Sequence, residues 1–250
     1  MWVGCKDGTF PPRAETAALT LGRAVHAYVL EGPAVFESRF AFGGPINPKT
    51  NRRFGSDTKA YHKWAAEQGK PCLSFEERDQ VVRMATAVRQ NPDAVKWLDG
   101  EHEVTFRTKL DGMPVQCRCD TINEGEKWIS DLKTTESLAK FRRSFIGLGY
   151  HRQRAIYRLV VSKVLDIPVA SIRFPFVVVE KNPPYAVGIF ELTDRLDLLG
   201  ESEVDTSLAR MRAVKAGAKP RRDPEGVQML DCPEYLLADL ELTTAIEEDF

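Results

Sequence analysis

Apolar and polar residues alternate along several short stretches in the middle of the chain, which is the pattern of strands with one buried face. In the first stretch, Val104 and Phe106 fall on one face, while Glu103 and Arg107 fall on the other. The segment 123–126 has turn composition and lies between two such stretches, which predicts a hairpin. We expect strands at 103–108, 117–123, 128–135, 172–180 and 186–192.

Apolar residues at helical spacing predict most of the other elements. Ser74 and Glu77 have the spacing of a capping box, which marks a helix start. We expect helices at 14–30, 58–68, 75–90, 92–98, 150–165 and 194–216, and a further strand at 36–42. This order predicts an α/β (α+β) fold in which helices flank a central mixed β-sheet. We expect one domain over 1–250, with an irregular start (1–14) and an acidic tail (236–250).

Composition narrows the class of protein. Hydrophobic residues make up 43% of the 250 positions, which is ample for a core. The chain lacks an 18-residue apolar run and an N-terminal signal region, so we expect a cytoplasmic protein without a membrane span. Five scattered cysteines fit neither a disulfide framework nor a zinc or iron–sulfur pattern.

Three charged residues stand out on the predicted hairpin. Asp120 lies on its first strand, and Asp131 and Lys133 share one face of its second strand. The aspartates are 131 − 120 = 11 positions apart, so a hairpin can bring both to the same end of a sheet. Two carboxylates beside an ammonium group form an oxygen-rich pocket suited to Mg²⁺ or Mn²⁺. An Asp-x-Lys pattern also occurs by chance, but this strand is largely apolar, and buried charges need a partner or a metal.

The same residues carry a resemblance to a known family. Asp120 followed by Asp131-Leu-Lys133 resembles the signature of the PD-(D/E)xK nucleases, which have a restriction-endonuclease-like core. The segment 21–31 resembles the Gly-x-x-x-His helix of the RecB, lambda-exonuclease and RecE types, and 150–157 resembles their Gln-x-x-x-Tyr helix. The segment 180–187 resembles a strand pair of RecE-like phage exonucleases.

The resemblance implies a metal site. Asp120 and Asp131 would hold Mg²⁺, or Mn²⁺ in its place, together with His26, Glu103 and the backbone carbonyl of Leu132. From the residues alone, Glu103 is equally well a surface charge, and a lone helical histidine is more often structural.

Further residues gain roles from the same comparison. Lys133 would act on the attacking water or on the developing charge, and we expect burial and the cation to lower its pKa. Gln153 and Tyr157 would align the scissile strand or order their helix against the site.

Positive charge is concentrated next to this motif, although the net charge of the chain is −1. From Ser137 to Leu165 there are basic residues and no acidic one, which favours phosphate contact over two solvated helix faces. We expect DNA contacts from Arg118, Arg142, Arg143, Arg152, Arg154 and Arg158. The basic loop 47–53 is as well explained by a solvated surface as by DNA contact.

These observations lead to a hypothesis of a Mg²⁺-dependent deoxyribonuclease. The resemblance implies a RecE-like 5′-to-3′ exonuclease acting on double-stranded DNA ends in phage-type recombination. It also implies a homo-oligomer, a single-strand annealing protein as partner, and a phage or prophage origin in a bacterial host. Two alternatives stay open: an endonuclease or nickase of the same superfamily, and a non-catalytic DNA-binding protein with a nuclease-like fold.

Overall fold

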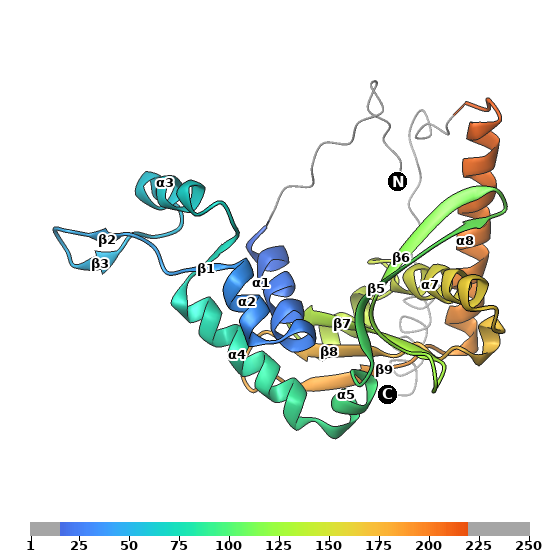
Figure 1. The fold of residues 1–250 in the computed structure, drawn as a ribbon, viewed down its shortest axis with the longest axis horizontal. Helices are drawn as coiled ribbons and strands as arrows, with labels where there is room; N and C mark the ends of the chain where they lie inside the picture. Colours follow the sequence, from blue (N-terminus) through green and yellow to red (C-terminus); the bar gives the residue numbers. More distant parts are fainter. Residues whose placement is uncertain (1–15, 220–250) are drawn as a thin grey trace, which may run out of the picture. The chain divides into compact units, whose positions relative to one another are not determined.

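A five-stranded sheet is the centre of the computed structural model, which describes residues 16–219 (Figure 1). Its strands follow one another across the sheet in chain order. They are β5 (Glu101–Leu110), β6 (Met113–Asn123), β7 (Trp128–Thr135), β8 (Phe176–Glu180) and β9 (Val187–Phe190). All neighbours are antiparallel except β7 and β8, which are parallel. The predicted mixed sheet is confirmed.

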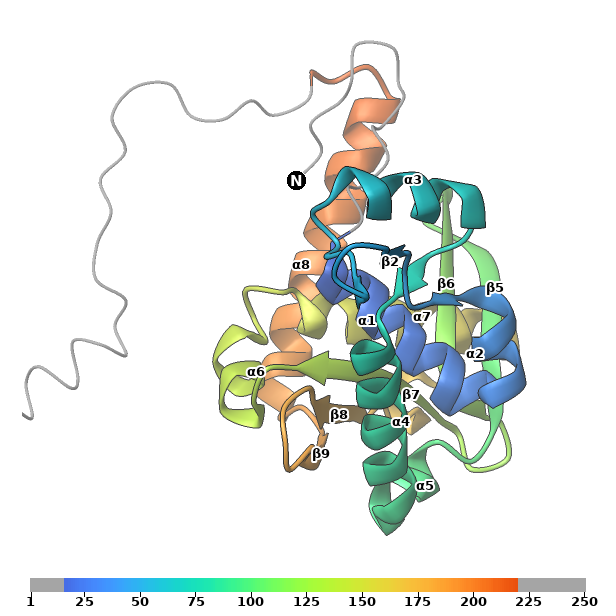
Figure 2. The ribbon, with the colours of Figure 1, turned by 90° about the vertical axis from the view of Figure 1, so that its left-hand side faces the viewer.

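Helices cover both faces of the sheet (Figures 1 and 2). One core cluster joins α1 (Ala17–His26) and α4 (Phe75–Gln90) to the β8 side chains Val177 and Val179. A second cluster joins α6 (Leu138–Ser144) and α7 (Tyr150–Leu165) to the alternate β8 residues Phe176 and Val178. β8 is therefore buried on both faces, as parallel strands with helices on each side usually are.

The N-terminal elements differ from the prediction in two places. The helix expected at 14–30 is α1 followed by a short π-helix, Ala27–Glu31. The strand expected at 36–42 is wrong, because most of this segment forms helix α2 (Pro33–Arg39). Gly32, with φ 94°, ends the first helix, and Pro33 suits the first position of the next.

Residues 43–70 form an excursion that we call the arm. It contains the short hairpin β2 (Ile46–Asn47) and β3 (Arg52–Arg53), followed by helix α3 (Lys59–Gln68). Figure 1 draws these elements at the left, beyond α1 and α2. Two-residue strands β1 (Ala41–Phe42) and β4 (Cys72–Leu73) pair in parallel and close the base of the arm.

The remaining helices follow the sequence closely. Helix α4 begins with the expected capping box between Ser74 and Glu77. The predicted helices at 58–68, 75–90, 92–98, 150–165 and 194–216 are confirmed as α3, α4, α5 (Pro92–Trp97), α7 and α8 (Asp194–Lys215). A 3₁₀ turn, Val169–Ser171, lies between α7 and β8.

The described part of the chain divides after Arg212: 16–212 form one compact unit, and 213–219 belong to a second. The predicted irregular start (1–14) and acidic tail (236–250) lie outside the described residues. That the whole chain is one nuclease domain stays a prediction. Among the helices of 16–219, none is long and apolar enough to span a membrane.

Candidate metal site

The backbone pairing of β6 with both of its neighbouring strands is interrupted at Asp120. The register of β5 and β6 places Glu103 opposite Asp120, yet these two residues make no ladder pair although their neighbours on both sides do. Glu103 has φ 58°, a left-handed backbone that residues other than glycine rarely adopt. Pairing with β7 also stops one residue before Asp120. Instead, Oδ2 of Asp120 accepts a hydrogen bond from the backbone N–H of Leu132 at 2.8 Å.

Three of the predicted ligands meet at this opening. One side-chain ligand atom each from His26, Glu103 and Asp120 lies within 4.8 Å of the other two. His26 is the last residue of α1, and its Nδ1 lies 3.4 Å from Oδ2 of Asp120. The backbone of Leu132 also forms a hydrogen bond with His26. The backbone carbonyl of Leu132, which is a predicted ligand, therefore belongs to a segment beside the cluster. Two carboxylates and an imidazole can hold a divalent cation.

Asp131 lies next to this cluster but has its own partners. Its Oδ1 accepts a hydrogen bond from Gln153 of α7, and its Oδ2 forms an ion pair with Lys133. Lys133 Nζ also lies 4.8 Å from the centre of the Tyr150 ring, a cation–π distance. The structure thus brings the Asp-x-Lys motif together with Gln153, while Asp131 is outside the three-residue group. Its role as a metal ligand stays a prediction.

Burial raises the pKa of both acidic residues in the cluster, and nearby cations only partly oppose it. Burial, and then the nearby charge of Asp131, raise the pKa of Asp120 well above its usual range. Burial likewise raises the pKa of Glu103, although the guanidinium of Arg118 opposes this shift. The pKa of His26 is lowered, chiefly by burial. A bound cation would favour a neutral imidazole at His26 and ionised carboxylates at Asp120 and Glu103, because ligands bind a metal in their deprotonated forms.

The pKa of Lys133 is raised by the surrounding protein residues, whereas the sequence predicted that it would be lowered. Burial does lower it, but the charge of Asp131, their hydrogen bond and the charge of Asp120 outweigh burial. The pKa of Lys133 is therefore raised, and these carboxylates hold the side chain as an ammonium ion.

Tyr157 and Tyr150 complete the side of the site formed by α7. The Tyr157 ring stacks on Phe174, with ring centres 5.9 Å apart. Burial, and then the charge of Asp131, raise the pKa of Tyr157 to about 12. No role was predicted for Tyr150, although its position three residues before Gln153 on the same helix was the available signal.

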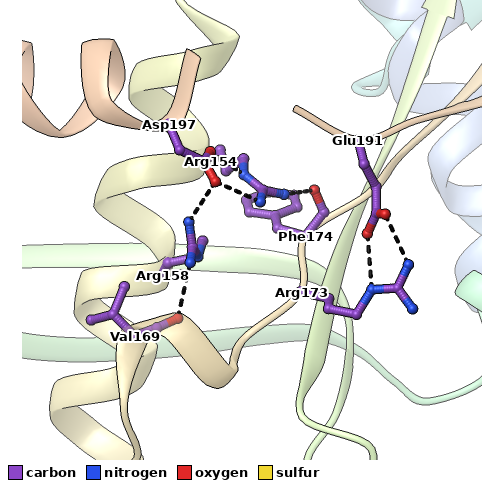
Figure 3. Close-up of polar contacts among 7 residues, drawn as sticks. All are labelled: Arg154, Arg158, Val169, Arg173, Phe174, Glu191 and Asp197. Carbon is purple, nitrogen blue, oxygen red and sulfur yellow. Dashed lines mark hydrogen bonds and ion pairs between the residues drawn. The ribbon is translucent and has the colours of Figure 1, made fainter. Parts of the chain in front are cut away.

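Two predicted DNA contacts, Arg154 and Arg158, are wrong. Both side chains are buried, and both pair with the carboxylate of Asp197 in α8 (Figure 3). Arg154 also donates to the carbonyl of Phe174, and Arg158 donates to that of Val169 at 3.1 Å. Buried guanidinium groups that already have these partners do not face a phosphate. Figure 3 also shows a separate surface pair, Arg173 with Glu191 at 2.8 Å.

The other four predicted arginines are exposed. Arg118 is 65% exposed and pairs with Glu103 at 2.8 Å, so a guanidinium lies at the edge of the metal site. Arg152 lies 3.4 Å from Glu203, and Arg142 stacks over the Phe190 ring at 5.3 Å. Arg143 is exposed on α6. Their contact with DNA stays a prediction.

Comparisons with known proteins give a family and a fold. A structure from Eubacterium rectale, named a putative exonuclease, superposes with a TM-score of 0.61 over 91% of this chain and 80% of its own, at 17% identity. That identity supports a shared fold only. A search of curated proteins found no match. The family described as a PDDEXK-like domain of unknown function (DUF3799) matches residues 6–240. With its mixed sheet and its Asp120, Asp131 and Lys133, the chain belongs to this family and to the PD-(D/E)xK superfamily.

Proposed function

We propose that the protein is a metal-dependent deoxyribonuclease. The observation that carries the proposal is the meeting of His26, Glu103 and Asp120 beside the Asp131–Lys133 pair. These residues fit a divalent cation, because carboxylate oxygens suit Mg²⁺ and Mn²⁺, and because burial and the charge of Asp131 disfavour an ionised Asp120 that no cation binds. When bound, the cation would offset the charge of a phosphodiester and lower the pKa of a coordinated water.

The other side chains of the site would each have a separate role in phosphodiester hydrolysis. Lys133 is held by Asp131 as an ammonium ion, so its role is to orient the attacking water or to stabilise charge that develops on the phosphate. Gln153 fixes the opposite oxygen of Asp131 and keeps that carboxylate from rotating. Arg118 provides a positive charge at the open edge of the site, where a phosphate would arrive.

The finer proposal is a RecE-like 5′-to-3′ exonuclease that acts on double-stranded DNA ends. The four motifs in RecE-like order support it, and the similar structure from Eubacterium rectale is itself named a putative exonuclease. Phage-type recombination, an annealing-protein partner and a homo-oligomer follow from the same resemblance.

Linear DNA and covalently closed circular DNA are each incubated with Mg²⁺ or with chelator. The products distinguish an exonuclease from an endonuclease or nickase and from a non-catalytic DNA-binding protein. We expect Mg²⁺-dependent loss of linear duplex only, with end-labelled strands showing 5′-to-3′ polarity. Cutting or nicking of the circle would indicate an endonuclease. If neither substrate is cut with any divalent cation, the catalytic proposal is wrong.

Metal binding has its own test, measured by calorimetry without DNA. We expect Mn²⁺ and Ca²⁺ to bind the wild type, with Ca²⁺ supporting little turnover. Asp120→Asn and His26→Ala should weaken binding at least tenfold. Glu124→Gln is the control, because Glu124 is an exposed carboxylate in the β6–β7 turn. Equal metal affinity in all four proteins would remove the site.

A further inference from the structure

The arm carries a net positive charge, whereas the charges of all other residues sum to a negative value. Its six basic residues and two acidic ones give a net charge of 6 − 2 = +4, whereas the whole chain has −1. The other residues therefore sum to −1 − 4 = −5. The basic residues of the arm are Lys49, Arg52, Arg53, Lys59, Lys63 and Lys70.

The arm has little core of its own. Helix α3 has no buried residue, and the rings of Tyr61 and Trp64 pack at a tilt with their centres 5.4 Å apart. Arg53 lies over the Phe75 ring at 4.6 Å and so fastens the hairpin to the start of α4. A helix whose residues are at most partly buried gains little stability from packing, and its exposed side is open to contact with another molecule.

Three of the arm's cations are available for such contacts. Arg52, Lys59 and Lys63 are exposed, and none has an ion-pair partner within residues 16–219. Arg52 lies on β3, and both lysines lie on α3. The arm thus offers cations from two elements to one partner.

The base of the arm is connected to the metal site. Lys70 donates to the backbone carbonyl of Ser38 in α2 at 3.1 Å. Arg39, the next residue, pairs with Glu31, which ends the π-helix that follows His26. The base of the arm is therefore anchored to the helical segment that carries His26 into the metal site.

We propose that the arm binds the sugar–phosphate backbone of the duplex whose scissile phosphate lies at the metal site. The inference rests on the proposed function and adds a second, remote contact with the substrate. Charge decides the occupant, because a net +4 on an otherwise acidic protein matches a polyanion. A protein partner would call for a contiguous apolar patch, whereas the exposed apolar residue of the hairpin is Ile46 alone.

The test compares two triple variants with the wild type. Arg52→Gln, Lys59→Gln and Lys63→Gln together remove three charges from the arm. Lys109→Gln, Lys127→Gln and Lys215→Gln remove three exposed charges outside the arm and outside the basic stretch 137–165, and serve as the control. Binding to a 30-base-pair duplex is measured against salt concentration with Ca²⁺, and hydrolysis of bis(p-nitrophenyl) phosphate is measured with Mn²⁺.

We expect the arm variant to bind the long duplex at least about tenfold more weakly at 0.1 M salt. Its log–log salt slope should be smaller by up to about 2.7, because each phosphate contact contributes about 0.9. A duplex of about 10 base pairs, one helical turn, should show a much smaller loss. Hydrolysis of the small phosphodiester should match the wild type.

Two other results would overturn the inference. An unchanged affinity and salt slope, with wild-type DNA cleavage intact, would show that the protein is a nuclease whose arm does not touch DNA. A change in oligomeric state without a change in DNA binding would assign the arm to a protein interface. If the wild type neither binds nor cuts DNA, the proposed function itself fails, which is a separate outcome.

Discussion

Gln153 of α7 donates a hydrogen bond to Oδ1 of Asp131 on β7. The next residue, Arg154, points to Asp197 of α8 and to the carbonyl of Phe174, just before β8. Helix α7 is therefore held by polar contacts from two adjacent residues, one toward the site and one toward a buried ion cluster. The position of Gln153 therefore depends on its own contact with Asp131 and on the contacts of Arg154.

Asp197→Asn should lower the free energy of unfolding by about 3–5 kcal/mol, the usual cost of leaving a buried ion pair without one partner. Two buried guanidinium groups share this carboxylate, so the penalty belongs in the upper part of that range. Chemical denaturation measures it. Arg143→Gln, at an exposed position, is the control and should change stability by less than about 0.5 kcal/mol. Equal stability of both variants would contradict a structural role for the cluster.

Asp131→Asn should abolish DNA cleavage and leave the fold intact. The variant loses the ion pair with Lys133 but also loses the repulsion that raises the pKa of Asp120, and these two effects on stability oppose each other. Turnover, circular dichroism and thermal unfolding are measured on the same sample. Wild-type cleavage by this variant would remove Asp131 from the site.

Lys133→Ala should reduce kcat by roughly 10²–10⁴-fold, as expected for a group that acts in the transition state. Affinity for DNA should change little, because Asp120 and the exposed arginines remain. Lys133→Arg should not restore the rate, since the planar guanidinium is larger and must fit beside the Tyr150 ring, 4.8 Å from Nζ. Loss of DNA binding with a normal single-turnover rate would instead make Lys133 a phosphate anchor.

Tyr157 should make stability depend on pH in the alkaline range. Its pKa is raised from 10.0 to about 12 in the folded protein, so the folded state keeps a proton that the unfolded chain loses. The stabilisation is complete below pH 10 and is lost as pH rises through about 12. After allowance for solvent screening, the loss should be about 1 kcal/mol. Tyr157→Phe should show a flatter decline, and phenolate absorbance follows the titration; identical profiles would contradict the shift.

Local patterns predicted the hairpin well. Alternation placed Asp120 and Arg118 on one face and Cys117 and Cys119 on the other, and the structure buries both cysteines in a core cluster. The turn composition of 123–126 fixed the register that places Asp120 near Asp131. These features depend on neighbours within about ten positions, which a single sequence contains.

Long-range partners could not be predicted in the same way. Arg154 and Arg158 lie in a stretch without acidic residues, but their partner, Asp197, follows about 40 positions later on another helix. The left-handed backbone of Glu103 also has no sequence signal, because glutamate does not favour it. The strand expected at 36–42 fails for a local reason, since Gly32 at φ 94° ends one helix and Pro33 directly begins the next.

The parallel pairing of β7 with β8 also fixes the order in which the site can form during synthesis. Asp131 pairs with Phe176, so the strand that carries the Asp-x-Lys motif lacks one neighbour until about 45 more residues have been made. Gln153 lies within that connection, and Arg154 waits for Asp197 still later. Chains grow from the N-terminus at about 5–20 residues per second. A ribosome-bound chain that ends before β8 therefore holds Glu103, Asp120 and Asp131 without the full arrangement of the site, which is completed only after Asp197 has been made.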